Sequence, residues 1–259
     1  MTEIKKTLAI LKARWPEASL LIGLNVLLLL SNFIFGIGKL DLTTSSSLLP
    51  FGVHMVFIIV LLILGLGFLR TFYLEGQKQQ PPLVLLRIGK HFFWRMFGLG
   101  LLFMIIYLVL AGLIFLIVKQ FTSMDTSFSQ VTPWIRHLCF AASMLILIKP
   151  VLLIPALIIV LDCKAFKSFK LLKQCKILNM KELVMLFFVS MALTFLWAFL
   201  PTPQDTMTIS QYILIVCLAV VGNFIGLMIV VLAVRFVASL DLVYDEQISP
   251  SDSQRFTEE

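Results

Sequence analysis

The sequence has 259 residues, of which 60% are hydrophobic and 14% are charged, and its mean hydropathy is +1.02. Soluble domains are about 45–50% apolar and about 25% charged, so this chain is too apolar to cover itself with polar surface in water. The composition therefore excludes a soluble protein and predicts an integral membrane protein. The apolar runs are continuous rather than alternating, which also excludes a β-barrel.

Six apolar stretches are each about long enough to cross the hydrocarbon core, which takes about 20 helical residues. In chain order they are Ser19–Ile37, Phe51–Leu69, Met96–Val118, Leu138–Leu161, Leu183–Leu200 and Tyr212–Leu240. The sequence thus predicts an all-α fold, a polytopic transmembrane helical bundle with six spans, in a single membrane domain over residues 1–243. The acidic residues 244–259 are expected to form a disordered cytoplasmic tail, and a contact between this tail and the lysine-rich segment is the alternative.

Lysine and arginine are concentrated before the first span, between the second and third, and between the fourth and fifth. The opposite side of the bundle has only Lys39, Lys119 and Arg136. Because basic residues are retained on the cytoplasmic side, both termini are predicted to be cytoplasmic. The basic pI of about 9.3 is explained by these links and does not indicate a nucleic-acid partner.

Each outward-going span is preceded by a basic, partly apolar segment: Met1–Arg14, Pro82–Arg95 and Lys164–Lys181. This pattern divides the chain into approximate units of residues 1–75, 82–163 and 164–243, which we interpret as a threefold organisation. Pro81 and Pro82 are a start signal for a helix in the second segment.

The third basic segment is amphipathic on a helical wheel. Leu171, Leu172, Cys175 and Leu178 fall on one side, and lysines fall on the other. Such helices lie at the membrane interface with their lysine stems extended toward the head groups, so we predict cytoplasmic amphipathic interface helices. The candidate residues for binding anionic lipid are Lys164, Lys167, Lys170, Lys173, Lys176, Arg87, Lys90 and Arg95. The alternative is a plain loop whose charges only fix orientation.

Lys149 lies near the middle of the fourth predicted span and is followed by Pro150 and Pro155. A charge in the hydrocarbon is costly, and two prolines kink the helix and free backbone carbonyls. These residues indicate a site for an anionic ligand or lipid phosphate, or a proton-linked lysine. The alternative is a lysine that reaches the interface or has a structural partner.

Two further polar residues lie in the sixth predicted span. Asn223 lies between Gly222 and Gly226, whose spacing allows helices to approach closely, and Arg235 lies near the cytoplasmic end, where snorkelling explains it. The full candidate internal polar site is Lys149, Pro150, Pro155, Asn223 and Arg235. Asn25 and Asn32 share a face of the first span and favour hydrogen bonds between helices.

Catalytic patterns are missing from the sequence. His54, His91 and His137 are scattered, without a H-E-x-x-H pair, and no serine lies in a G-x-S-x-G setting. The cysteines, Cys139, Cys163, Cys175 and Cys217, form no close-spaced metal pattern and are expected to be reduced and unpaired. We therefore expect no catalytic residues, no metal and no cofactor.

The stretch Lys149–Glu182 resembles a recurrent bacterial pattern. A kinked span ends at Pro155-Ala156, Asp162 leads into Lys164–Ser168, and a basic helix runs into the next span. This is similar to the integral-membrane domain found beside glycerophosphoryl diester phosphodiesterases and to stand-alone YciC-type inner-membrane proteins. The chain carries no phosphodiesterase domain, so that activity is not implied. The resemblance implies a multi-pass helical bundle of the bacterial inner (cytoplasmic) membrane.

These observations predict a non-enzymatic scaffold or accessory subunit, or a component of envelope lipid homeostasis. Its expected partners are membrane lipids with anionic head groups, and a membrane-protein partner is left open. The alternative function is a small transporter or channel with a polar site at the kinked fourth span.

Overall fold

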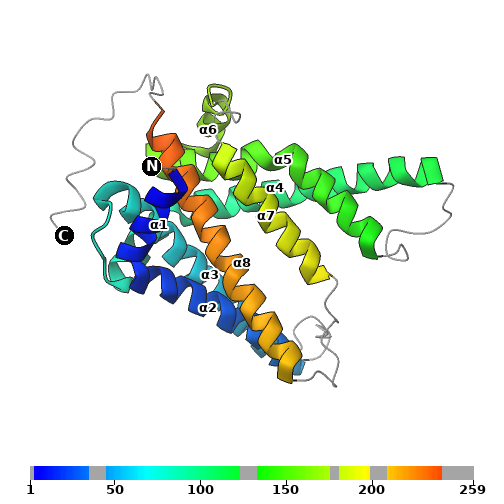
Figure 1. The fold of residues 1–259 in the computed structure, drawn as a ribbon, viewed down its shortest axis with the longest axis horizontal. Coiled ribbons are helices and arrows are strands. Elements are labelled where there is room, and N and C mark those ends of the chain that lie inside the picture. Colours follow the sequence, from blue (N-terminus) through cyan, green and yellow to red (C-terminus); the bar gives the residue numbers. More distant parts are fainter. Residues whose placement is uncertain (1–2, 35–44, 123–132, 176–180, 199–208, 241–259) are drawn as a thin grey trace.

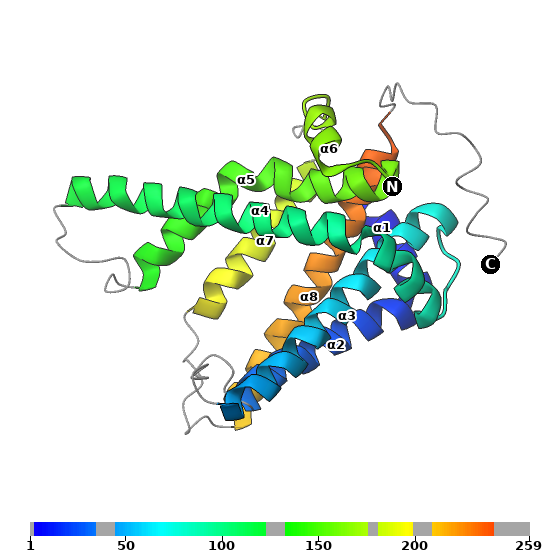
Figure 2. The ribbon, with the colours of Figure 1, turned by 180° about the vertical axis from the view of Figure 1, so that it is seen from behind.

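The computed structural model describes residues 3–34, 45–122, 133–175, 181–198 and 209–240. Within these ranges the elements are all α-helices, which confirms the predicted all-helical class. In chain order they are α1 (Glu3–Ala13), α2 (Trp15–Ile34), α3 (Ser45–Glu75), α4 (Pro82–Thr122), α5 (Pro133–Leu161), α6 (Ala165–Leu171), α7 (Lys181–Ala198) and α8 (Ile209–Ala238). Figure 1 and Figure 2 show the arrangement from opposite sides. The tail of residues 244–259 lies outside the described residues.

Several of the described helices suit a membrane. Four are long and apolar enough to cross one, over Gly52–Glu75, Pro82–Gln120, Ala141–Leu161 and Ser210–Ala238. The pair α1 and α2 adds a fifth if it is counted as one broken span. The chain is therefore membrane-embedded with four or five candidate spans in the described ranges, and the six-span count stays a prediction.

The pair α1 and α2 is bent by 88° around Arg14. Pro16 explains the break, because it has no N–H to donate to the Lys12 carbonyl and its ring would clash with that carbonyl in a continuous helix. Proline is tolerated in the first turn of α2, where the N–H groups have no helical acceptor. The helix α1 buries Thr7 and Leu11 and is therefore packed on one side.

The helix α4 begins at Pro82, as the proline predicted, but it does not stop before the third predicted span. The segment Pro82–Arg95, which the sequence suggested as a separate interface helix, is the first part of this 41-residue helix. It is packed rather than peripheral, since Leu85, Phe92 and Phe93 are buried. No proline follows Pro82 in α4, so the backbone can continue as a helix through Arg95 into the apolar stretch.

Two glycines allow the start of α4 to touch α3. A Cβ atom added at Gly67 would lie 1.8 Å from the carbonyl oxygen of Leu85, and one added at Gly89 would lie 1.8 Å from that of Ile63. No other residue type fits such a distance, so the two backbones meet here because both positions are glycine. Small residues have this role at helix contacts in membranes.

The core lies where α3, α5 and α8 meet. Leu153, Ile154, Leu157 and Ile158 of α5 are fully buried, and Phe68 of α3 and Val231 and Val234 of α8 belong to the same cluster. Figure 1 shows α5 changing direction along its length, and both Pro150 and Pro155 lie inside this helix. Pro150 precedes the most buried part of α5, and Pro155 lies within it. The middle of α4 instead exposes apolar side chains such as Met104, Ile105 and Leu108, as a lipid-facing helix does.

Candidate functional site

The junction between α5 and α6 gathers charged groups from α4. Asp162 follows α5 in a left-handed conformation, with φ +48°. Its Oδ1 accepts a hydrogen bond of 2.6 Å from Arg95 Nη1 and lies 3.3 Å from His91 Nε2. Arg95 Nη1 also donates to the Asp162 carbonyl at 3.3 Å. Arg95 of the second basic segment is therefore bound to Asp162, two residues before the third basic segment begins at Lys164.

Arg70 of α3 binds the same junction from another side. Its Nη1 donates to the carbonyl oxygens of Ile159, at 2.5 Å, and Val160, at 3.0 Å. The last carbonyls of a helix have no partner within the helix, so Arg70 caps α5. Its guanidinium also lies 5.5 Å from the ring centre of Phe92 and 5.6 Å from that of Tyr73. This role could not be predicted from the sequence, because the cap joins residues far apart in the chain.

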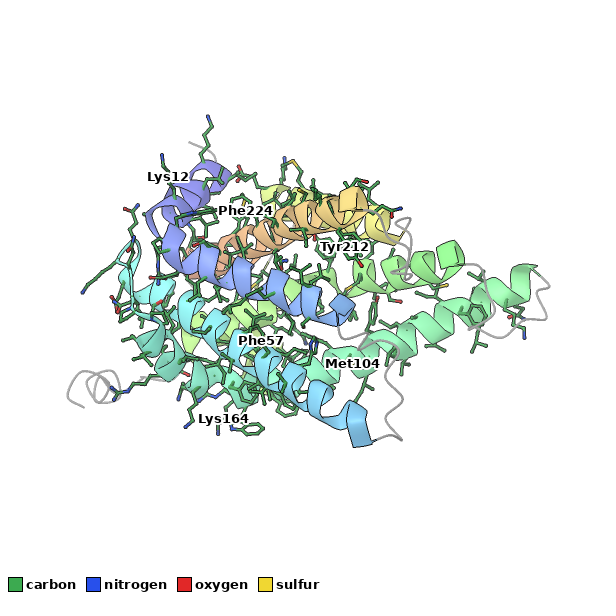
Figure 3. All side chains as sticks on the ribbon, turned by 90° about the horizontal axis from the view of Figure 1, so that it is seen from below. Lys12, Phe57, Met104, Lys164, Tyr212 and Phe224 are labelled. Atoms are coloured by element: carbon green, nitrogen blue, oxygen red, sulfur yellow. The ribbon has the colours of Figure 1, made fainter. Side chains whose placement is uncertain are left out.

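Around this junction lies a group of cations with two aromatic side chains, which we call the basic surface. Phe166 is 85% exposed and Trp94 is 74% exposed. The exposed cations are Arg87, Lys90, Lys164, Lys170 and Lys173, and Arg95 and Lys167 are half-buried. Figure 3 shows Lys164 away from the far ends of α4 and α5. Arg95 is bound to Asp162, which lies two residues before Lys164, and this contact joins the two groups of candidate lipid-binding residues. Lys176 lies outside the described residues.

The predicted amphipathic helix in this region is shorter than expected. The helix α6 has only 7 residues and gives way to turns that run to Cys175. Its sidedness agrees with the helical wheel, since Leu171 and Cys175 are buried while Lys170 and Lys173 are exposed. Phe169 holds α6 against α4 through an edge contact with Phe103, with 6.3 Å between the ring centres. Packing against α4 therefore stabilises α6, because a helix of 7 residues is too short to be stable by itself.

Lys149 is half-buried in α5 and lies beside the basic segment rather than alone among the spans. Burial raises the pKa of the Cys175 thiol, and the nearby ammonium of Lys149 partly opposes this rise. Cys175 follows α6, so this proximity brings Lys149 to the edge of the region described above. Among the described residues, Lys149 forms no hydrogen bond or ion pair with Asn223 or Arg235. The candidate internal site as a whole stays a prediction.

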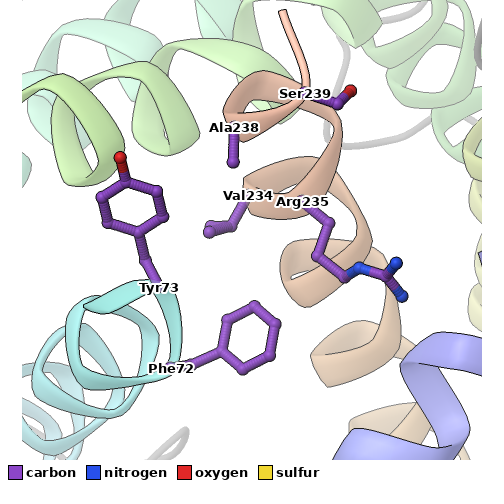
Figure 4. Close-up of a pocket in the computed structure, with 6 residues that line it drawn as sticks. All are labelled: Phe72, Tyr73, Val234, Arg235, Ala238 and Ser239. Atoms are coloured by element: carbon purple, nitrogen blue, oxygen red, sulfur yellow. The ribbon is translucent and has the colours of Figure 1, made fainter. Parts of the chain in front are cut away.

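Arg235 is held by α1. Its Nη2 lies 2.8 Å from Glu3 Oε2, and its Nη1 donates to Thr7 Oγ1 at 3.2 Å. It borders a pocket of about 310 Å³ between α3 and α8, whose other lining residues are Phe72, Tyr73, Val234, Ala238 and Ser239. Figure 4 shows the guanidinium directed away from Tyr73 and out of this pocket. The predicted snorkelling arginine is thus a structural ion pair.

A buried polar cluster at the corner between α1 and α2 was not predicted. Arg14 is fully buried, forms an ion pair with Glu17, and donates to Thr71 Oγ1 at 2.8 Å. Its guanidinium lies 4.8 Å from the ring centre of Phe68. Glu17 Oε1 accepts the backbone N–H of Gln80 at 2.5 Å. The i, i+3 spacing of Arg14 and Glu17 indicates an ion pair, but it does not show that the two side chains are buried.

A second unpredicted feature is a cavity of about 680 Å³ that lies between the helices and is open on one side. Its walls come from α2, α3 and α8, with Met96 of α4 and Pro155 of α5. Asn25 and Asn223 line it and are joined by a hydrogen bond of 2.6 Å from Asn25 Nδ2 to Asn223 Oδ1. The predicted interhelical hydrogen bonding of Asn25 is thus confirmed, and the side chain of Asn32 lies outside the part of the chain that the structure describes. Of the predicted internal residues, only Pro155 and Asn223 meet here.

The described ranges contain no group of three or more His, Cys, Asp or Glu residues that could hold a metal ion. The lining residues of the cavity include two amide side chains and no charged one. Comparison of the chain with protein families, with curated proteins and with solved structures finds no match. Function must therefore be argued from these residues.

Proposed function

We propose that this chain is a non-enzymatic protein of a bacterial inner membrane that holds anionic lipid head groups on its basic surface. In this role it acts as a scaffold or accessory subunit, or in envelope lipid homeostasis. Both termini are cytoplasmic in this proposal, and the basic surface lies at the inner leaflet. The observation that carries the proposal is the exposure of Phe166 and Trp94 among the exposed lysines of α6 and the start of α4.

Exposed aromatic side chains beside lysines are typical of a membrane interface. Tryptophan is enriched at the head-group level, and amphipathic helices bury phenylalanine between lipids while their lysines face the head groups. Phe166 is 85% exposed, which would cost free energy in water but stabilises the protein if the side chain inserts into lipid. We infer that α6 is an interface helix anchored by Phe166.

The charge of the basic surface favours an anionic partner. Arg95 and His91 share the carboxylate of Asp162. Within the described ranges no ion pair is formed by the exposed lysines Lys90, Lys164, Lys170 and Lys173. Juxtamembrane lysines contribute about 1 kcal/mol each to binding an anionic leaflet. Several of them on one surface therefore favour anionic lipid strongly over neutral lipid.

A transporter or channel, the alternative, has less support. A polar path needs charged or hydrogen-bonding side chains in sequence across the bundle. Lys149 does not line the cavity, whose polar lining side chains are Asn25 and Asn223.

The test is the binding of anionic phospholipid to purified protein in nanodiscs of neutral lipid, measured by native mass spectrometry. Lys164→Gln/Lys170→Gln/Lys173→Gln should weaken binding on the order of a hundredfold, from about 1 kcal/mol per lysine. Lys5→Gln/Lys12→Gln/Lys78→Gln is the matched control, because it removes equal charge from exposed lysines outside the basic surface. Equal losses of lipid binding in both variants would mean that the lipid responds only to the net charge of the protein, which would contradict the proposal.

A further inference from the structure

The cavity between α2, α3 and α8 has the properties of a ligand site inside the membrane. Its volume of about 680 Å³ lies within the range of about 300–1,000 Å³ that is typical of small-molecule sites. Its walls are mainly aliphatic, with Leu21 and Leu28 from α2, Leu62 and Leu66 from α3, and Leu227 from α8. Such walls favour an apolar molecule.

The only hydrogen-bonding side chains among the lining residues lie at half the length of their helices. Asn25 is central in α2, which runs from Trp15 to Ile34, and Asn223 is central in α8, which runs from Ile209 to Ala238. A helix that crosses the bilayer has its middle residues near the membrane midplane. The amide pair is therefore about 15 Å from either head-group boundary, since the hydrocarbon core is about 30 Å thick.

The amide pair keeps unused hydrogen-bonding capacity. Each carboxamide nitrogen carries two N–H groups. Asn25 Nδ2 uses one for Asn223 Oδ1, and Asn223 Nδ2 uses one for the Ala219 carbonyl at 2.8 Å. One N–H on each side chain thus has no acceptor among the described residues. An unpaired donor in an apolar medium costs about 1–3 kcal/mol, so an acceptor placed between them would be bound favourably.

We propose that the cavity binds a neutral lipid that carries a carbonyl group on a long apolar chain, as prenylated quinones do. The carbonyl oxygen, which has two lone pairs, would accept the spare N–H groups of Asn25 and Asn223. Ordinary phospholipids are excluded from this contact, because their ester carbonyls stay with the charged head group at the boundary. The site is separate from the basic surface and does not rest on the function proposed for that surface.

The glycines of the cavity make the proposal testable. A Cβ atom added at Gly65, Gly222 or Gly226 meets nothing within 4 Å, so a larger side chain can enter the cavity without a backbone clash. Gly226→Phe should place a ring in the part of the cavity beside Asn223, because the two residues are three apart in α8 and both line the cavity. Gly112→Phe is the matched control, because Gly112 of α4 is exposed and also has nothing within 4 Å.

The experiment measures binding of two probes to the full chain in nanodiscs of neutral phospholipid. One probe is a prenylated benzoquinone, and the other is an oxygen-free prenyl hydrocarbon of the same chain length. The wild-type protein should retain the quinone about tenfold better, which corresponds to about 1.4 kcal/mol from the hydrogen bonds. Asn25→Leu/Asn223→Leu should remove this preference. Gly226→Phe should weaken binding of both probes, while Gly112→Phe leaves it intact.

The proposal is overturned if wild-type protein binds both probes equally or binds neither. It is also overturned if Gly226→Phe binds the quinone as well as Gly112→Phe does. The first comparison needs no variant, so it holds even if the double leucine variant fails to fold. Neutral nanodiscs contain no anionic lipid, so this result is independent of the test of the basic surface.

Discussion

Glu3 near the start of α1 forms an ion pair with Arg235 near the end of α8, with 2.8 Å between Glu3 Oε2 and Arg235 Nη2. The next residue, Ile4, donates its backbone N–H to Glu182 Oε2 of α7 at 2.8 Å. The helix α1 therefore lies across the ends of two helices from the last part of the chain. These contacts place the first and last described helices at the same end of the molecule, which supports the proposal that both termini share one side of the membrane.

The docking of α1 should depend on acid pH through Glu3. The hydrogen bond from Lys6 lowers the pKa of Glu3 below 4.5, partial burial opposes this, and the positive charge of Arg235 adds to the lowering. A lowered folded-state pKa gives stability that is present above pH 4.5 and lost as the pH falls through the folded value. Hydrogen exchange of the α1 amides, corrected for intrinsic pH dependence, should therefore rise below pH 4.5.

Glu3→Gln should reproduce the acid state at pH 7. Because an exposed ion pair contributes about 0.2–1 kcal/mol, exchange of α1 should rise by about 1.5-fold to fivefold. The rise in the variant should then be independent of pH. Unchanged exchange in both the wild type at low pH and the variant would mean that Glu3 does not hold α1.

Loss of Arg14 should be severe. Arg14→Met leaves the buried carboxylate of Glu17 without its cation, which costs about 3–5 kcal/mol. Arg14→Met/Glu17→Gln should recover most of this loss, because the glutamine is neutral and keeps an acceptor for the Gln80 N–H. Thermal unfolding in detergent compares the variants. If Arg14→Met were as stable as the wild type, the result would contradict a stabilising ion pair between Arg14 and Glu17.

The contact between α3 and α4 should distinguish two glycines on the same helix. Gly67→Ala places a Cβ atom 1.8 Å from the Leu85 carbonyl oxygen, so the helices must separate. Overpacking of this kind costs about 1–3 kcal/mol or more. Gly65→Ala, two residues earlier, meets nothing within 4 Å and should leave the unfolding temperature nearly unchanged. Equal effects at both positions would contradict the close contact.

Asp162 and Arg95 should have opposite effects on anionic lipid. Arg95→Gln removes a cation from the basic surface and should weaken binding about fivefold, from about 1 kcal/mol per basic residue. Asp162→Asn removes the carboxylate that neutralises Arg95 and should strengthen binding by a similar factor. Asparagine tolerates the left-handed φ of +48°, so the backbone should be retained. Changes of the same sign would contradict an electrostatic role.

The sequence predicted features that depend on local chemistry. Continuous apolar runs predicted the helical class, Pro82 predicted the start of α4, and the spacing of Leu171 and Cys175 predicted the buried side of α6. Each depends on residues within a few turns of one another. The orientation in the membrane and the threefold units stay predictions.

Features that depend on contacts between distant residues were not predicted. The cations in the first part of α4 indicated a separate interface segment. In the structure this part packs on α3, where Gly89 meets Ile63, and that contact cannot be predicted from the local sequence. The proximity of Lys149 to Cys175 also joins distant parts of the chain, and the internal site predicted around Lys149 stays a prediction. The cavity needs three helices to meet, and Asn25 and Asn223 become partners only through that meeting.

The most direct test of the central claim is extraction of the wild-type protein and Lys164→Gln/Lys170→Gln/Lys173→Gln into native nanodiscs, followed by mass spectrometry of the retained lipids and proteins. The account predicts that anionic phospholipid is enriched over the bulk membrane with the wild type and that this enrichment is lost with the variant. Wild-type nanodiscs with the lipid composition of the bulk membrane would contradict it, and a stoichiometric protein lost only from the variant would assign the basic surface to that partner.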